Sequence, residues 1–156
     1  MQVRQILLVC TANMCRSPMA EALCRYLAAH RPALAGIEAM SAGVGDNYAG
    51  YEATDDAQEA MRDRGIDLST HESQALSPAL VEWADLILTM TPDHRDTVVR
   101  RHPDAAERTF TLGDYAGTGE SVPDPVGRGP VAYEACAGQL ERLLDLVLER
   151  LAPEPR

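Results

Sequence analysis

Three side chains near the start of the chain, Cys10, Arg16 and Ser17, form a Cys-x5-Arg-Ser pattern. The apolar run before Cys10 is typical of a buried strand, and Pro18 after Ser17 marks the first turn of a helix. Backbone N–H groups at a helix N-terminus bind anions, and they lower the pKa of a thiol placed beside them. The pattern therefore predicts a loop that binds a tetrahedral oxyanion and a thiolate that attacks it.

Each of these side chains suits a step in phosphate chemistry. A Cys10 thiolate would be the nucleophile, and the planar fork of Arg16 can hold two phosphate oxygens, which a lysine cannot do. Ser17 can donate a hydrogen bond to the thiolate, or to the sulfur as a leaving group. The predicted phosphate-binding segment comprises Thr11, Ala12, Asn13, Met14, Cys15, Arg16 and Ser17.

A second match to the same spacing, Cys136 with Arg142, lacks this context. It falls inside a helical repeat of leucine and valine, with neither a turn nor a helix start beside it. We therefore assign the chemistry to the match at Cys10.

The segment 113–129 is rich in glycine and proline, and we expect one long irregular loop there. Asp124 lies in it between Pro123 and Pro125, on stiff backbone that can hold a side chain over a neighbouring pocket. Thiolate attack on a phosphate monoester needs an acid for the leaving oxygen and then a base for water. Asp124 is the predicted acid and base.

Short apolar runs alternate with helical patterns along the whole chain. The predicted strands cover 5–9, 37–40, 85–90 and 108–111, and the predicted helices cover 18–30, 54–64, 78–83, 93–101 and 131–151. This alternation, with short loops, predicts an α/β fold with a parallel sheet covered on both faces. The loop after the first strand would lie at the carboxyl edge, where such sheets bind ligands.

Length and composition narrow the possible partners. A chain of 156 residues suits a single domain, 1–156, and its net charge of −10 argues against nucleic acid or an anionic membrane as partner. No apolar run is long enough to span a membrane, and the first strand begins too near Met1 for a signal peptide. We expect a cytoplasmic protein, since a reactive thiol needs a reducing compartment. The cysteines lack metal-ligand spacing, so we expect neither metal nor cofactor.

The chain resembles the low-molecular-weight protein tyrosine phosphatase family over nearly its full length. The matching stretches are VCTANMCRSPMAE at 9–21, SAG at 41–43, LSTH at 68–71, ADLILTM at 84–90 and DP at 124–125. The resemblance implies a small, doubly wound fold with four parallel strands and helices on both faces. It also implies hydrolysis of phosphotyrosine on protein substrates through a phosphocysteine, with inorganic phosphate as product.

The resemblance assigns roles to individual residues. It implies Cys10 as nucleophile, Arg16 as oxyanion clamp and Asp124 as acid and then base. It implies that Cys15 can form a reversible disulfide with Cys10 under oxidation, which would protect the nucleophile from irreversible oxidation.

The resemblance also concerns the shape of the loop. It implies that Asn13 takes an unusual backbone conformation, held by Ser17, Ser41 and His71. The family usually has glycine where Ala12 stands, so we expect an ordinary φ at this alanine.

Three features of the sequence bear on which phosphorylated residue is the substrate. Tyrosine phosphatases of the family commonly have aromatic residues after the Asp-Pro pair, where this chain has Val126 and Gly127. Tyr48 or Tyr51 is expected to supply the opposite wall of the substrate cleft. Met14 favours an aromatic ring by apolar contact, whereas phosphoarginine phosphatases of the family typically have threonine there. Phosphotyrosine is the predicted substrate, and phosphoarginine is the alternative.

Two further functions fit the sequence less well. Arsenate reduction by a related fold needs additional cysteines, and none lies between Arg25 and Ala135. A non-catalytic phosphate-binding module would be expected to lack the nucleophile or the acid, whereas Cys10 and Asp124 are both present.

Overall fold

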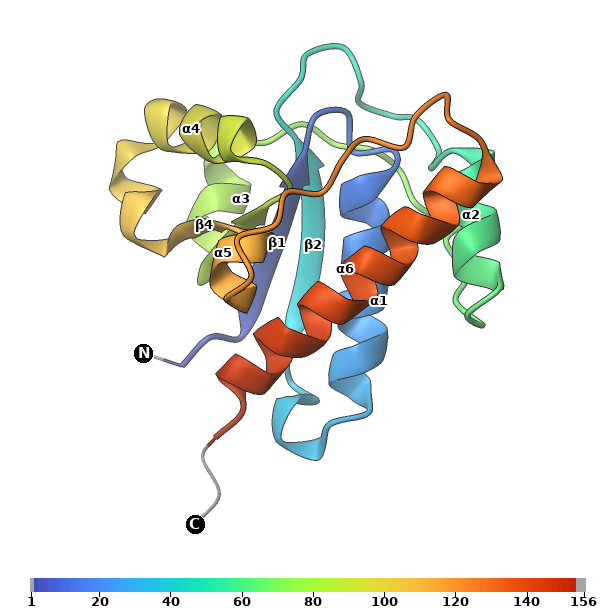
Figure 1. Ribbon diagram of the computed structural model, residues 1–156. Coiled ribbons are helices and arrows are strands. Elements are labelled where there is room, and N and C mark those ends of the chain that lie inside the picture. The colour runs from blue at the N-terminus through green and yellow to red at the C-terminus, as the bar shows by residue number, and fades with distance from the viewer. Residues whose placement is uncertain (1, 154–156) are drawn as a thin grey trace.

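A parallel sheet of four short strands forms the centre of the molecule (Figure 1), and the computed structural model describes residues 2–153. The strands are β1 (Gln5–Cys10), β2 (Glu38–Gly43), β3 (Leu86–Thr89) and β4 (Thr109–Thr111). They pair in the order β2-β1-β3-β4, and every pair is parallel. The chain direction across the sheet reverses at β1, so the carboxyl end of β1 is the switch point where such sheets bind ligands.

Alternate side chains of β1 pack against different helices, as expected for a strand buried on both faces. Ile6 and Leu8 belong to the larger apolar core, beneath α1 (Arg16–Ala29), α2 (Asp55–Arg62) and α6 (Pro130–Leu151). Leu7 and Val9 belong to a second core, beneath α3 (Pro78–Trp83) and α4 (Pro92–Arg101). Figure 1 shows the two helical layers on either side of the sheet. The predicted α/β fold is confirmed.

The predicted strands and helices are all present, with bounds shifted by a few residues. The largest shift is in β2, which continues three residues beyond the predicted end, to Gly43. Two 3-10 helices, Pro32–Leu34 and Pro103–Arg108, complete the connections. No helix among residues 2–153 is long and apolar enough to cross a membrane.

One prediction about a loop is wrong. The segment expected to be irregular from residue 113 begins with a short helix, α5 (Leu112–Ala116). The Thr111 hydroxyl accepts a hydrogen bond from the Asp114 N–H at 3.0 Å and so caps the helix start, while Gly117, with φ of 87°, ends it. The remainder of the segment runs without helix or strand to α6, and it carries Asp124 past the carboxyl end of β1.

Candidate active site

Cys10 is the last residue of β1, and Arg16 is the first residue of α1, so the five residues between them form the turn from strand to helix. The Cys10 side chain is buried, with 2% of the residue exposed. Its Sγ lies 2.9 Å from the Ser17 hydroxyl and accepts a hydrogen bond from the Asn13 N–H at 3.3 Å. Both groups can stabilise negative charge on the sulfur.

Asn13 stands at the centre of the loop, in the left-handed conformation with φ of 59°. Its Nδ2 donates to Ser17 Oγ at 2.8 Å and to Ser41 Oγ at 2.9 Å, and its carbonyl lies 2.8 Å from His71 Nε2. The structure thus brings together the residues that the family resemblance implied. Outside glycine, only Asn13 and Asn47 have positive φ in the described part of the chain, so Ala12 has an ordinary φ.

Two residues that support this network were missed in the sequence. Ser41 Oγ donates to Glu21 Oε1 at 2.8 Å, and the Gln74 N–H donates to Asn13 Oδ1 at 2.9 Å. Glu21 lies one helical turn after Ser17, hence on the same face of α1, which is a signal that the sequence contains. Gln74 gives no such signal, because its contact is made by the backbone.

Arg16 and Asp124 face each other across the mouth of the loop. Arg16 is buried, with 5% of the residue exposed, and its Nη1 donates to the Val122 carbonyl at 3.0 Å. Its Nη2 lies 3.7 Å from Asp124 Oδ2, while the side chain of Asp124 remains 46% exposed. The guanidinium is therefore held by its surroundings, and the carboxylate is accessible to a substrate.

A pocket of about 270 Å³ opens over the loop. Its residues are Cys10, Thr11, Ala12, Met14, Cys15, Arg16, Tyr48, Thr54, Asp124 and Val126. Met14, Tyr48 and Val126 give it an apolar part, which adjoins the polar loop. Of the two tyrosines proposed for the wall, the structure places Tyr48 in the pocket lining, whereas Tyr51 is 53% exposed and lies outside it.

Cys15 lines the same pocket as Cys10, and both are free thiols. Its Sγ lies 3.2 Å from the Tyr133 hydroxyl and 3.8 Å from Thr54 Oγ1. Burial raises the pKa of the Cys15 thiol, and the two hydrogen bonds offset part of that rise. Burial and the contact with Cys15 raise the pKa of Tyr133 as well. No pattern in the sequence indicates this contact of Tyr133, because the residue follows the core periodicity of α6.

Thr11 has a partner that the sequence analysis also missed. Its Oγ1 lies 2.8 Å from Nε2 of His94, a residue in the first turn of α4. The loop is therefore held by side chains from several elements: by Ser41 of β2, by His94 of α4 and by Tyr133 of α6.

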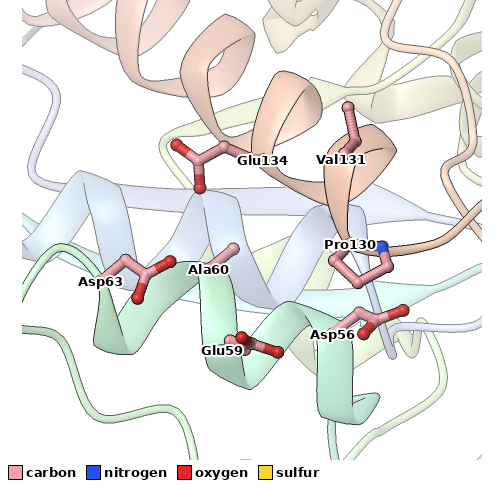
Figure 2. A pocket seen from close by; sticks show the side chains of 7 residues that line it. All are labelled: Asp56, Glu59, Ala60, Asp63, Pro130, Val131 and Glu134. Atoms are coloured by element: carbon pink, nitrogen blue, oxygen red, sulfur yellow. The ribbon is translucent and has the colours of Figure 1, made fainter.

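A second pocket, of about 220 Å³, lies between α2 and the start of α6 (Figure 2). Carboxylates from both helices line it, and among them Glu134 pairs with Arg64 at 2.8 Å. Its full lining is Asp56, Glu59, Ala60, Asp63, Pro130, Val131 and Glu134. It contains no residue of the 10–17 loop, and its charge repels an oxyanion, so it does not suit phosphate binding.

Comparisons with known proteins agree with this geometry. The profile of the family described as "Low molecular weight phosphotyrosine protein phosphatase" matches residues 5–156. A protein-arginine-phosphatase of Geobacillus stearothermophilus is 40% identical, covering 96% of this chain and 97% of the relative. A probable low molecular weight protein-tyrosine-phosphatase of Ralstonia solanacearum is 37% identical, with the same shares covered.

A solved structure gives the same result. The low molecular weight protein tyrosine phosphatase from T. tengcongensis superposes with a TM-score of 0.88 at 34% identity, covering 94% of this chain and 99% of that one. The match of the family profile across the chain, the curated relatives and the shared fold lead to one conclusion. This protein belongs to the low molecular weight phosphotyrosine protein phosphatase family.

Proposed function

We propose that this protein hydrolyses phosphotyrosine on protein substrates through a phosphocysteine at Cys10. The observation that carries the proposal is the position of the Cys10 sulfur. It lies within hydrogen-bond distance of Ser17 and Asn13, in a pocket that also contains Arg16 and Asp124. Nucleophile, oxyanion clamp and acid thus share one cavity, as thiolate attack on a phosphate monoester requires.

In the first step, the backbone N–H groups of the loop and the Arg16 guanidinium hold the phosphoryl oxygens. The thiolate sulfur of Cys10 attacks phosphorus, and the bond from phosphorus to the tyrosine oxygen breaks. The protonated carboxyl of Asp124 donates its proton to that leaving oxygen, so tyrosine departs as a neutral phenol.

In the second step, water attacks the phosphorus of the phosphocysteine. The Asp124 carboxylate takes a proton from this water, and the bond between sulfur and phosphorus breaks with its electron pair returning to sulfur. The Ser17 hydroxyl and the Asn13 N–H stabilise the departing thiolate, and inorganic phosphate is released. The cycle uses neither a metal nor a cofactor.

The apolar part of the pocket supports an aromatic substrate. Met14 and Tyr48 line it, and a phenyl ring gains from contact with a thioether and with another ring. Val126 offers a smaller apolar surface beside Asp124 than an aromatic residue would. We therefore expect phosphotyrosine to bind, with part of its ring open to solvent.

Phosphoarginine is the second candidate, because the 40% identical relative from Geobacillus stearothermophilus is named a protein-arginine-phosphatase. The same two steps would cleave a bond from phosphorus to nitrogen. Met14 cannot offer a hydroxyl to a guanidinium group, and this difference in chemistry favours phosphotyrosine.

Residues 1–156 would act as one catalytic domain, without nucleic acid or a membrane as partner. A cytoplasmic location would keep Cys10 and Cys15 reduced. Oxidation would join these two cysteines of the pocket in a disulfide that reductant reverses.

Parallel assays of a phosphotyrosine peptide and a phosphoarginine peptide test the substrate assignment, with reductant and without added metal. We expect a higher kcat/KM for phosphotyrosine, and we expect Met14→Thr to lower that value about fivefold, because an apolar contact is lost. Met40→Thr, in β2 and outside the pocket, is the matched control for a change of methionine to threonine. A clear preference of the unaltered protein for phosphoarginine would refute the assignment and favour the second candidate.

A further inference from the structure

One histidine near the loop has no assigned role in the two steps above. His94 is buried, with 7% of the residue exposed, and its Nε2 lies 2.8 Å from Thr11 Oγ1. Its other ring nitrogen, Nδ1, is the only buried side-chain nitrogen or oxygen without a hydrogen-bond partner among residues 2–153. Burial of a half-satisfied imidazole is costly, so its contact with Thr11 calls for an explanation.

The backbone of His94 is held in place at the start of α4. The hydroxyl of Thr91 caps α4 and accepts a hydrogen bond from the His94 N–H at 3.3 Å. This helix packs against β3 and β4, on the face of the sheet opposite α1. His94 therefore connects the loop to the helical layer formed by α3 and α4. None of the other side-chain contacts of the loop reaches this layer.

The unpartnered nitrogen indicates which ring nitrogen bears the proton. A buried N–H without an acceptor is rarer in proteins than an acceptor without a donor. This favours the tautomer with the proton on Nε2, which then donates to the Thr11 hydroxyl oxygen. Thr11 is also held through its backbone, because its carbonyl accepts a hydrogen bond from the Gly45 N–H at 2.8 Å.

The charge state supports the same arrangement. Burial, and then the positive charge of Arg16, lower the pKa of His94 to about 4, against a smaller opposite influence from Asp93 and Asp124. The imidazole is neutral near pH 7, so it does not compete with Arg16 for an anion in the pocket.

We propose that His94 is a positioning residue that holds the phosphate-binding loop in its anion-binding shape through the Thr11 hydroxyl. Thr11 directly follows the nucleophile, so its position sets where the first peptide groups of the loop point. Small displacements of positioned groups weaken both binding and reaction. This inference rests on the proposed function, since it gives His94 a part in the same phosphate site.

The test measures the dissociation constant of inorganic phosphate by calorimetry, with kcat for an aryl phosphate as a second readout. We expect His94→Leu and Thr11→Val each to weaken phosphate binding about fivefold, roughly the effect of one hydrogen bond. The double variant should bind no more weakly than either single variant, because both remove the same contact. His94→Gln, whose amide can still donate, should restore binding to within about twofold.

Loss of folded protein is distinguishable from loss of loop geometry. Irreversible loss of folded protein lowers the binding stoichiometry and kcat together, whereas it leaves the dissociation constant of the remaining folded protein unchanged. His30→Leu, at the far end of α1, is the matched control and should bind phosphate as the unaltered protein does. If His94→Leu does not fold, Thr11→Val and His94→Gln decide the outcome.

Unchanged phosphate binding in Thr11→Val, or effects that multiply in the double variant, would overturn the inference. Failure of the proposed function has a different signature. The unaltered protein would then bind phosphate without hydrolysing either phosphopeptide, and the binding comparison among the variants would still decide the role of His94.

Discussion

The Asp124 carboxylate is the most exposed of the groups to which we assign chemistry. It lies 3.7 Å from Arg16, and its Oδ1 accepts a hydrogen bond from the Val126 N–H at 3.1 Å. These contacts hold the side chain at the pocket while leaving it free to meet a leaving group. A general acid of this kind matters most where the leaving oxygen is strongly basic.

Replacement of Asp124 by asparagine should therefore depend on the substrate. We expect Asp124→Asn to lower kcat/KM, which reports the first step only, about a hundredfold for a phosphotyrosine peptide and less than tenfold for p-nitrophenyl phosphate, whose leaving group needs little protonation. Steady-state kinetics on the two substrates measure the difference. An equal loss of kcat/KM on the two substrates would contradict the assignment of Asp124 as the acid.

Sequence reasoning succeeded for elements whose signals are local. The strand β1 was predicted from its apolar run, and the helix predicted from residue 18 on the basis of its first-turn proline begins at Arg16. The spacing of Cys10 and Arg16 then places a thiol and a guanidinium at one loop. Contacts made across the fold were missed, as with His94 and Tyr133, because no local pattern encodes them.

The short helix α5 was missed for the same reason. It has only five residues, and its own hydrogen bonds are too few to maintain it in isolation. Gly113 within it packs so tightly that an added Cβ would lie 1.9 Å from the Glu120 carbonyl oxygen. The helix therefore depends on the backbone of the segment that leads to Asp124.

Gly113→Ala should accordingly destabilise the protein. We expect the free energy of unfolding to fall by about 2 kcal/mol or more, because the new methyl group displaces the backbone near Glu120. Gly138→Ala is the matched control, since a Cβ at this exposed position in α6 meets nothing within 4 Å. It should raise the free energy of unfolding by up to about 1 kcal/mol. Urea denaturation measures the free energy of unfolding of both variants. Equal values would refute the close packing of Gly113 against Glu120.

Across the whole molecule, the helices on one face of the sheet bury two thiols outside the active site. Burial raises the pKa of Cys24 and of Cys136 from 9.0 to about 12. The folded protein therefore keeps these protons at a pH where the unfolded chain has released them. Their contribution to stability is complete below pH 9 and is lost as the pH rises toward 12.

The free energy of unfolding should thus decline through this alkaline range. One such thiol contributes a slope of up to about 1.4 kcal/mol per pH unit. Cys24→Ala should make the decline shallower by up to that amount, as measured by urea denaturation at several pH values. An unchanged slope in Cys24→Ala would show that this thiol does not titrate differently in the folded and unfolded states.

The sheet and both helical layers contribute contacts to the loop at the end of β1. Side chains from β2, α4 and α6 contact it, and the long segment before α6 brings Asp124 to its mouth. The central claim that follows is that the sulfur of Cys10 carries the phosphoryl group between the two steps.

Rapid acid quenching with a phosphotyrosine peptide, followed by mass spectrometry of the labelled chain, tests this claim most directly. We predict covalently bound phosphate, the label, on Cys10. Cys10→Ala should lose both the label and turnover, and Cys24→Ala should retain both. Label on another residue, or turnover that persists in Cys10→Ala, would contradict the account.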